Sequence, residues 1–297
     1  MARISCLLLA AVVVATTAAA AAAGGGGSVL DKPISALRPD VVVDKAGGGG
    51  AVTTVGEALQ RLERRVKGAA EYFIIYIKQG IYDEHLVIEA PKVVLIGDGM
   101  EKTIITGSLC NKTGQTLHES ATLTATEDAH GFMARDIGIH NTAGAADSKQ
   151  AVALFSDSNH SVFYRCDIKG FQDTLLANQH LHSSTATATS PARSTSSLGM
   201  RRPCSKTATS NLAVRRTPEA TTSEGAKPTP PSGQDSHIYY GEYKNHGGGA
   251  SVAHRVDWDG FHIIQSDEEA KQFTARKFIH GGDWLPETGV DYYLGLN

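Results

Sequence analysis

The chain has 297 residues, of which 41% are hydrophobic, and its formal net charge at pH 7 is −3. This length and apolar content suffice for one or two domains with a buried core. The small net charge argues against nucleic acid as a partner, because binding to phosphates requires a basic surface. The densest basic cluster, at 61–67, falls on a stretch with helical spacing, where a solvated helix face explains it.

The N-terminal segment has the pattern of a secretory signal peptide over residues 1–23. Arg3 gives a positive start, residues 6–14 are apolar, and the alanine-rich run that follows offers small-residue cleavage sites. A membrane anchor is the alternative, but the apolar run is short for a span, so we expect a secreted protein without a membrane segment. We expect residues 24–39 to be a linker and residues 40–297 to be the folded domain.

Three cysteines follow the signal peptide: Cys110, Cys166 and Cys204. An odd number in a secreted protein predicts a free thiol or an irregular pairing. Their spacing fits no metal-binding motif, and no phosphate-binding glycine loop is complete. The residues therefore predict neither a metal nor another cofactor.

A short N-terminal helix is predicted at 54–66, where apolar residues recur at helical spacing. Thr53 or Thr54 can cap it, and Glu57 stands three residues after Thr54, as in a capping box. No helical pattern of useful length interrupts the chain between Tyr72 and residue 170.

Short apolar runs follow one another over that region, each of strand length and bounded by Gly, Asn or Asp. They lie at 72–77, 85–88, 92–97, 103–107, 121–126, 131–141, 150–155 and 161–170. An ordinary doubly wound sheet would need helical crossovers, so an antiparallel sandwich and a parallel β-helix are the two choices left. Two-residue hairpin signals are few, which favours the β-helix.

Residues 180–236 have a different composition, rich in Ser, Thr, Ala and Pro and poor in large apolar residues. Such a segment buries too little surface to offset its conformational entropy, so we expect a disordered low-complexity insert. An insert of this length inside a compact domain is unusual.

Seven stretches together resemble plant pectinesterases, and they occur in the order of that family over 40–180 and 237–297. They are GIYDEHLVI (80–88), IGDGMEKTIITG (96–107), ARDIGIHNTAG (134–144), QAVAL (150–154), FYRCDIKGFQDTL (163–175), YYGEYKNHG (239–247) and GGDWLPETGV (281–290). The resemblance implies an all-β fold, a right-handed parallel β-helix of the pectin lyase-like type. It also implies hydrolysis of methyl esters in pectin, with no cofactor, by a monomer secreted to the plant cell wall. A proteinaceous pectinesterase inhibitor is an expected partner, and an inhibitor-like pro-domain is expected to be missing.

The same resemblance implies roles for four residues. The Q-D-T-L motif assigns Asp173 as the general acid and base and Gln172 as the oxyanion contact. Gln150, from Q-A-V-A-L, is expected to line the substrate pocket. Thr116 is expected to contact substrate, although TLHESAT has one residue more than the family's T-x-x-S-A-T.

The residue types suit an ester hydrolysis that uses two carboxyl groups. An ionised Asp would attack the ester carbonyl, and Asp173, kept protonated by apolar surroundings and a neighbouring carboxylate, would donate its proton to the departing methanol. Asp173 would then act as the base for the water that cleaves the acyl-enzyme, while Gln172 would stabilise the oxyanion. No G-x-S-x-G motif is present, which disfavours a serine esterase.

Two family motifs are missing from the chain. G-T-V-D-F-I-F-G, which carries the nucleophilic Asp, and L-G-R-P-W, which carries an Arg and a Trp of the site, do not occur. Codons permitted for Ser183 to Ser210, read one base out of step, can encode FYRDCDVTGTVDFIFGNA and then AAVFQDCD. We therefore expect a frame error near 180–236, in the gene or in its splicing, with the hidden Asp codon straddling Ser194 and Thr195.

Three functions remain open at this point. The first is an active pectinesterase, and the second is a catalytically dead homologue that still binds pectin. The third is another β-helix enzyme such as a lyase, which would depend on calcium and make unsaturated products. Methanol release separates the first from the second, and an ultraviolet-absorbing product separates the third.

Overall fold

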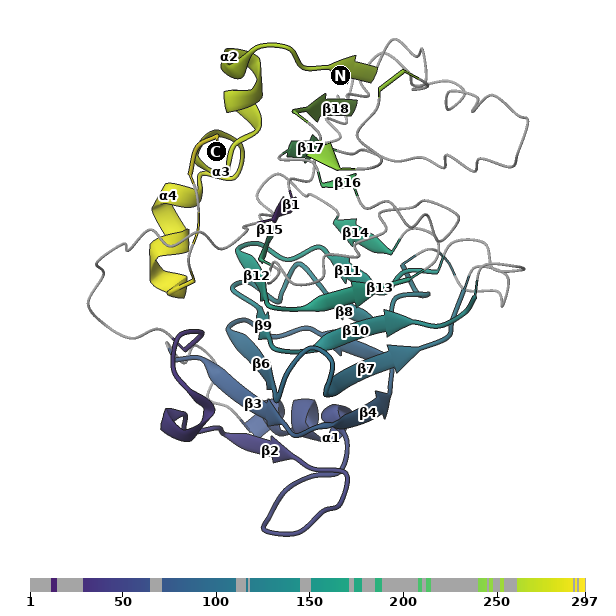
Figure 1. Ribbon diagram of the computed structural model, residues 1–297. Coiled ribbons are helices and arrows are strands. Elements are labelled where there is room, and N and C mark those ends of the chain that lie inside the picture. The colour runs from purple at the N-terminus through teal and green to yellow at the C-terminus, as the bar shows by residue number, and fades with distance from the viewer. Residues whose placement is uncertain are drawn as a thin grey trace, which may run out of the picture.

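Figure 1 shows the computed structural model, in which the chain winds upward in successive coils. The structure describes residues 12–14, 29–64, 71–110, 116, 118–144, 151–170, 174–177, 185–188, 208–209, 212–214, 240–244, 246–247, 252–253, 261–290, 292 and 294–296.

Three sheets form the body of the molecule, and the chain visits them in turn. Sheet A holds β1 (Val12–Val14), β15 (Thr185–Ala188), β12 (Ser161–Tyr164), β9 (Met133–Arg135), β6 (Val93–Gly97), β3 (Phe73–Ile77) and β2 (Val41–Val43). Sheet B holds β13 (Asp167–Lys169), β10 (Gly138–Asn141), β7 (Thr103–Gly107) and β4 (Gly80–Asp83). Sheet C holds β14 (Leu175–Ala177), β11 (Leu154–Ser156), β8 (Leu123–Ala125) and β5 (Leu86–Ile88).

Every pairing between strands in these three sheets is parallel. Each coil supplies one strand to each sheet, so the fold is a parallel β-helix. This confirms the predicted fold class and excludes the antiparallel sandwich.

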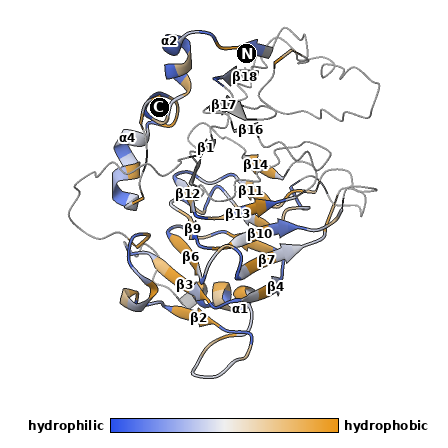
Figure 2. Cartoon of the chain, in the orientation of Figure 1, coloured by the Kyte–Doolittle hydropathy of each residue, from blue (hydrophilic) through white to orange (hydrophobic). Residues whose placement is uncertain are grey.

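The interior of the β-helix is filled by residues at every second position of each strand, because alternate side chains point to opposite faces. In sheet A, residues from four successive coils pair in register and are fully buried: Ile75, Leu95, Ala134 and Phe163. Figure 2 shows hydrophobic colour concentrated on β2, β3 and β6, and hydrophilic colour on α2 (Asp267–Ala270). Burial of these stacked apolar columns stabilises the packing of each coil on the next.

The connections between sheets A and B are tight corners, built by residues from several of the family-like motifs. A Cβ at Gly97 would lie 2.4 Å from the backbone oxygen of Asp136 on the next coil, so no side chain fits there. Asp136 itself adopts a left-handed backbone conformation (φ 57°) and accepts hydrogen bonds of 2.7 and 2.5 Å from the guanidinium of Arg165. Asp136 therefore has a structural role at this corner.

The predicted N-terminal helix is present as α1 (Val55–Gln60), followed by a 3-10 turn at Arg61–Arg64. Thr54 caps it, and Glu57 completes the predicted capping box. The carboxylate of Glu84 accepts hydrogen bonds from the backbone N–H groups of Val55 (2.9 Å) and Gly56 (2.8 Å), which fixes the helix start against the first coil. Val55 and Ala58 are fully buried, so α1 closes the lower end of the β-helix, as Figure 1 shows.

A second apolar cluster covers the outer face of sheet A. Its members from β6, β9 and β12 include Val94, Ile96, Met133 and Val162. The C-terminal segment packs there through α3 (Ala275–Phe278), α4 (Gly281–Trp284) and the 3-10 turn η6 (Leu285–Thr288).

Residues 29–37 join the same cluster, although they fall within the predicted linker over 24–39; residues 24–28 lie outside the described residues. Leu30 is 1% exposed, and its carbonyl oxygen accepts a 2.6 Å hydrogen bond from Nη1 of the buried Arg135. The 3-10 turn η1 (Ile34–Ala36) follows it. The apolar residues Val29, Leu30, Ile34 and Leu37 supply the surface that a linker would lack.

The upper part of the chain carries a small amount of further structure. β16 (Ala208–Thr209) pairs antiparallel with β19 (His246–Gly247), and β17 (Leu212–Val214), β18 (Tyr240–Tyr243) and β20 (Phe261–Ile263) form a three-stranded sheet. The 3-10 turn η5 (Lys271–Phe273) follows α2. Within 180–236 the structure describes the three short strands β15, β16 and β17, and the rest lies outside the described residues, so its disorder stays a prediction. Among the described residues, no helix is long and apolar enough to span a bilayer.

Candidate active site

The predicted site residues all belong to one corner of the β-helix, which we call the B–C corner. It consists of the connections from sheet B to sheet C, at 84–85, 108–122, 142–153 and 170–174. Thr116 lies on the second of these, Gln150 on the third, and Gln172 and Asp173 on the fourth. Thr116 is described by the structure, whereas Gln150, Gln172 and Asp173 lie outside the described residues.

Backbone hydrogen bonds align the three connections that carry these residues. The N–H of Thr122 donates to the carbonyl of Val152 at 3.2 Å, and the N–H of Ala153 donates to the carbonyl of Thr174 at 3.0 Å. Thr174 directly follows Asp173, and Val152 lies two residues after Gln150. The fold therefore brings the described ends of these three connections, at Thr122, Val152 and Thr174, to adjacent rungs at one edge of sheet C.

A buried amide ties two of these connections together at their bases. Nδ2 of Asn141 donates to the carbonyl oxygens of Leu109 (2.9 Å), Ser120 (3.1 Å) and Val152 (2.9 Å). Its Oδ1 accepts a 3.0 Å bond from the N–H of Ala143. Sequence reasoning quoted the NTAG motif but gave this Asn no role, because its partners are distant backbone carbonyls.

Thr116 is held in a local turn by Glu119. Its N–H (2.8 Å) and hydroxyl (3.0 Å) both donate to the Glu119 carboxylate, and the N–H of Glu119 donates back to the hydroxyl at 3.3 Å. The two bonds that Thr116 donates, first the one from its backbone N–H, lower the pKa of Glu119 below its ordinary value. The hydroxyl of Thr116 is thus occupied within its own turn, and its contact with substrate stays a prediction.

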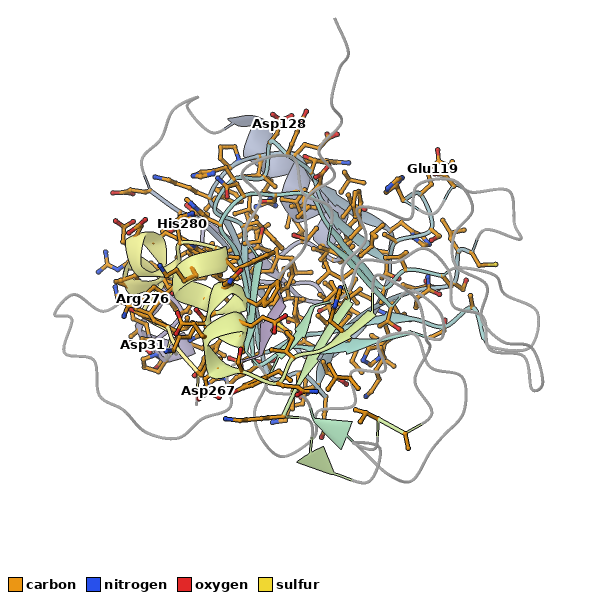
Figure 3. The ribbon with its side chains drawn as sticks, turned by 90° about the horizontal axis from the view of Figure 1, so that it is seen from above. Asp31, Glu119, Asp128, Asp267, Arg276 and His280 are labelled. Atoms are coloured by element: carbon orange, nitrogen blue, oxygen red, sulfur yellow. The ribbon has the colours of Figure 1, made fainter. Side chains whose placement is uncertain are left out.

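The outer face of sheet C forms the wall next to this corner. One residue from each strand occupies it in register: Val87, Thr124, Phe155 and Leu176. Val87 is 51% exposed, whereas Phe155 is only 8% exposed. Phe155 packs in a small apolar cluster with Ala121, Val152 and Leu176, and the tilted ring of His118 lies beside it with ring centroids 4.7 Å apart. Viewed from above in Figure 3, Glu119 marks this side of the molecule, opposite Arg276 and His280 of the C-terminal segment. Sequence reasoning did not single out His118 or Phe155, since nothing in the strand pattern links them.

The outer face of sheet B carries an ion-paired cluster beside the corner. The carboxylate of Asp167 lies 3.3 Å from Nε2 of His140 and also pairs with Nζ of Lys169. Burial raises the pKa of Asp167, but the hydrogen bonds from His140 and Lys169 outweigh it, so that its pKa is lowered overall. Asp167 therefore stays ionised and paired, which indicates a structural role for it.

The described cysteines and acidic residues do not form a metal-binding cluster. Among the described residues, no group of three or more His, Cys, Asp or Glu side chains is placed to hold a metal ion. Cys110 and Cys166 are buried, and burial raises the pKa of the Cys166 thiol to about 12, which makes that thiol unreactive. Cys204 lies outside the described residues.

Comparison with known proteins agrees with this architecture. The sequence profile of the Pectinesterase family matches residues 40–189 and 202–283. The chain belongs to the pectinesterase family. It is 33% identical over 320 aligned residues to putative pectinesterase/pectinesterase inhibitor 38 of Arabidopsis thaliana, covering 86% of this chain and 66% of that protein. It is 34% identical to pectinesterase 2 of Citrus sinensis, covering 87% of this chain and 61% of that protein.

The fold is also that of a solved pectinesterase. The structure of pectin methylesterase from carrot superposes with a TM-score of 0.62 at 27% identity, covering 88% of this chain and 99% of that chain. The chain spans about half to two thirds of the length of the curated relatives that it matches. Family membership confirms the resemblance on which the site residues were assigned.

Proposed function

We propose that this pectinesterase homologue is a carboxylic ester hydrolase of the plant cell wall, which converts methyl-esterified galacturonan to pectate and methanol. The observation that carries the proposal is the B–C corner, where the described ends of connections 108–122, 142–153 and 170–174 meet at a single edge of sheet C. The sequence places Thr116, Gln150, Gln172 and Asp173 on these connections. Family membership supports the substrate class.

The proposed mechanism uses two carboxyl groups. One ionised Asp attacks the ester carbonyl, and Gln172 donates to the oxygen that becomes negative. Asp173 donates its proton to the methoxy oxygen as the carbonyl–oxygen bond breaks, so that methanol leaves and an acyl-enzyme remains. Asp173 then removes a proton from water, which attacks the acyl carbon and releases the free galacturonate and the nucleophile. Gln150 and Thr116 contact the sugar chain.

The chain as written lacks the stretch that would supply the nucleophile, and this favours a second candidate. Neither G-T-V-D-F-I-F-G nor L-G-R-P-W occurs in it. Loss of a catalytic nucleophile commonly lowers the rate by several orders of magnitude. The second candidate is therefore a pectin-binding homologue with the surface of an esterase and little or none of its turnover.

Methanol release from highly esterified pectin decides between the two candidates. If the chain is an esterase, it releases methanol from the pectin, and Asp173→Asn abolishes this release while binding of pectin persists. Binding without methanol identifies the non-catalytic homologue. Sequencing of the transcript across codons 175–240 then shows whether the missing stretch is encoded in another frame. An unsaturated product that absorbs in the ultraviolet would contradict both candidates.

Location and partners follow from the same proposal. The N-terminal pattern and the wall-degrading chemistry together favour a monomer secreted to the cell wall, with pectin as its ligand and no nucleic-acid or membrane partner. A pectinesterase inhibitor protein is a further candidate partner. This partner is suggested by the names of relatives such as putative pectinesterase/pectinesterase inhibitor 38 of Arabidopsis thaliana.

A further inference from the structure

We propose that Asn141 is a positioning residue for the carbohydrate-binding surface, because its side-chain amide holds together the bases of the two connections that carry Thr116 and Gln150. This inference rests on the proposed function, since it takes the B–C corner as the place where the sugar chain binds. Asn141 is the last residue of β10, at the point where the chain leaves sheet B.

The contacts of Asn141 reach both ends of both connections. Leu109 and Ser120 lie near the start and the end of connection 108–122, and Val152 lies near the end of connection 142–153. Asn141 itself precedes the start of the second connection and bonds to Ala143 within it. One amide group therefore closes two loops and joins them to each other.

The arrangement is a fully satisfied buried network. Asn141 is 2% exposed, both amide N–H groups find carbonyl acceptors, and the amide oxygen accepts from a backbone N–H. Two neighbouring bonds strengthen it: Oγ1 of Thr122 donates to the carbonyl of His140, and the N–H of Val152 donates to Oγ of Ser120. Satisfied networks of this kind specify one arrangement of the groups that they join.

The strands are held by their own backbone ladders and do not depend on the bonds of Asn141. A role of Asn141 in positioning the connections can therefore be distinguished from a role in overall stability. β10 is already paired on both sides by the backbone ladders to β7 and β13. The three carbonyls that Asn141 binds lie outside the strands, in the connections. Loss of the amide should therefore loosen the loop bases and leave the ladders in place.

A backbone hydrogen bond also joins connection 142–153 to connection 170–174, to which Gln172 and Asp173 belong in the sequence. Val152 is followed by Ala153, whose N–H donates to the carbonyl of Thr174 at 3.0 Å. A shift of Val152 by a fraction of a strand spacing would move the end of connection 142–153 relative to Thr174 at the end of connection 170–174. Displacements on this scale have large effects on binding and catalysis.

The test compares Asn141→Leu and Asn141→Asp with a matched control at another corner. Ser158→Ala removes a buried hydrogen bond of 2.7 Å to the carbonyl of Ala129, on the connections between sheets C and A. The probe is a hexagalacturonan whose carboxyl groups are converted to amides. It is neutral at every pH and contains no ester to be cleaved. Affinity is measured by titration calorimetry at pH 5 and pH 8, and backbone amide hydrogen exchange is measured on the same proteins.

We expect Asn141→Leu to bind the probe roughly tenfold more weakly at both pH values, and Ser158→Ala to bind as the wild type does. We expect Asn141→Asp to be weak at pH 8 and to recover at pH 5. A buried carboxyl among carbonyl oxygens has a raised pKa, and its protonated form can donate one hydrogen bond. Exchange should accelerate at Thr122, Leu123, Ala153 and Leu154, and remain slow at Ile105 and Ile139.

Three results would overturn the inference: unchanged affinity in Asn141→Leu, exchange that accelerates evenly over all three sheets, or no pH dependence in Asn141→Asp beyond that of the wild type. If Asn141→Leu does not fold, Asn141→Asp at pH 5 provides the comparison. If the wild type does not bind the probe, the proposed function fails, and the location of the faster exchange alone decides the role of Asn141.

Discussion

At the scale of single residues, several of the motifs that carry the family resemblance serve the fold. Glu84, in GIYDEHLVI, receives the first N–H groups of α1. Gly97, in IGDG, allows the next coil to approach at Asp136. These residues explain why the stretches recur in a family without giving them a place in the chemistry.

Glu84→Gln should lower the free energy of unfolding by about 1–2 kcal/mol, because the carboxylate accepts two hydrogen bonds at the positive end of a helix and an amide oxygen replaces it poorly. Urea denaturation followed by circular dichroism measures the change. Glu89→Gln is the control, since Glu89 is exposed on the same coil. Equal stability of the two variants would show that Glu84 does not fix α1.

Gly97→Ala should destabilise the chain by about 1–3 kcal/mol, the usual cost of overpacking. The new Cβ would lie 2.4 Å from the backbone oxygen of Asp136, which cannot move without disturbing the A–B corner. Gly282→Ala serves as the comparison, because among the described residues its Cβ would meet Leu294 alone, at 3.8 Å, and alanine is a better helix former. A melting temperature for Gly97→Ala at or above that of Gly282→Ala would contradict the argument.

At the scale of elements, the docking of α4 on sheet A depends on aromatic packing at one corner. The ring of His160 stacks on Trp284, with centroids 4.8 Å apart and an interplanar angle of 17°. His130 lies beyond it, with ring centroids 5.1 Å apart. Burial and the neighbouring His130 lower the pKa of His160 below 6.5, while Glu287 acts in the opposite direction.

This geometry predicts a pH dependence of stability. Because the pKa of His160 is lower in the folded chain than in the unfolded chain, the unfolded chain binds more protons as the pH falls below about 6.5, so stability is lost on acidification. The loss ends below the lowered pKa, where both states are protonated. His160→Asn, which tolerates the left-handed backbone at this position (φ 56°), should show a smaller fall in unfolding free energy between pH 7.5 and pH 5. An equally steep fall in the variant would exclude His160 as the source.

At the scale of the whole molecule, the sequence predicted the type of fold but not the positions of all the corners between strands. Strand-length apolar runs without hairpin signals predicted the β-helix, and Thr54 and Glu57 predicted the start of α1. The runs at 131–141 and 161–170 each proved to be two strands. They break at Asp136 and Arg165, which take positive φ without the glycine that usually marks such a bend.

The candidate site was predictable only as far as the resemblance reached. Gln150, Gln172 and Asp173 come from motif matching and stay predictions, whereas the parallel topology explains why connections distant in sequence end at one corner. The role of Asn141 could not be read from the sequence, because its acceptors are backbone carbonyls up to 32 residues away. The packing of residues 29–37 on sheet A was missed because the adjacent glycine run suggested a linker.

The central claim is that this chain recognises methyl-esterified galacturonan at the B–C corner, whether or not it turns it over. Calorimetric titration of the purified chain with a methyl-esterified galacturonan oligosaccharide tests it most directly. We predict saturable binding, which Asn141→Leu weakens and Ser158→Ala does not. Absence of binding by the folded wild-type chain, or equal binding by all three proteins, would contradict the account.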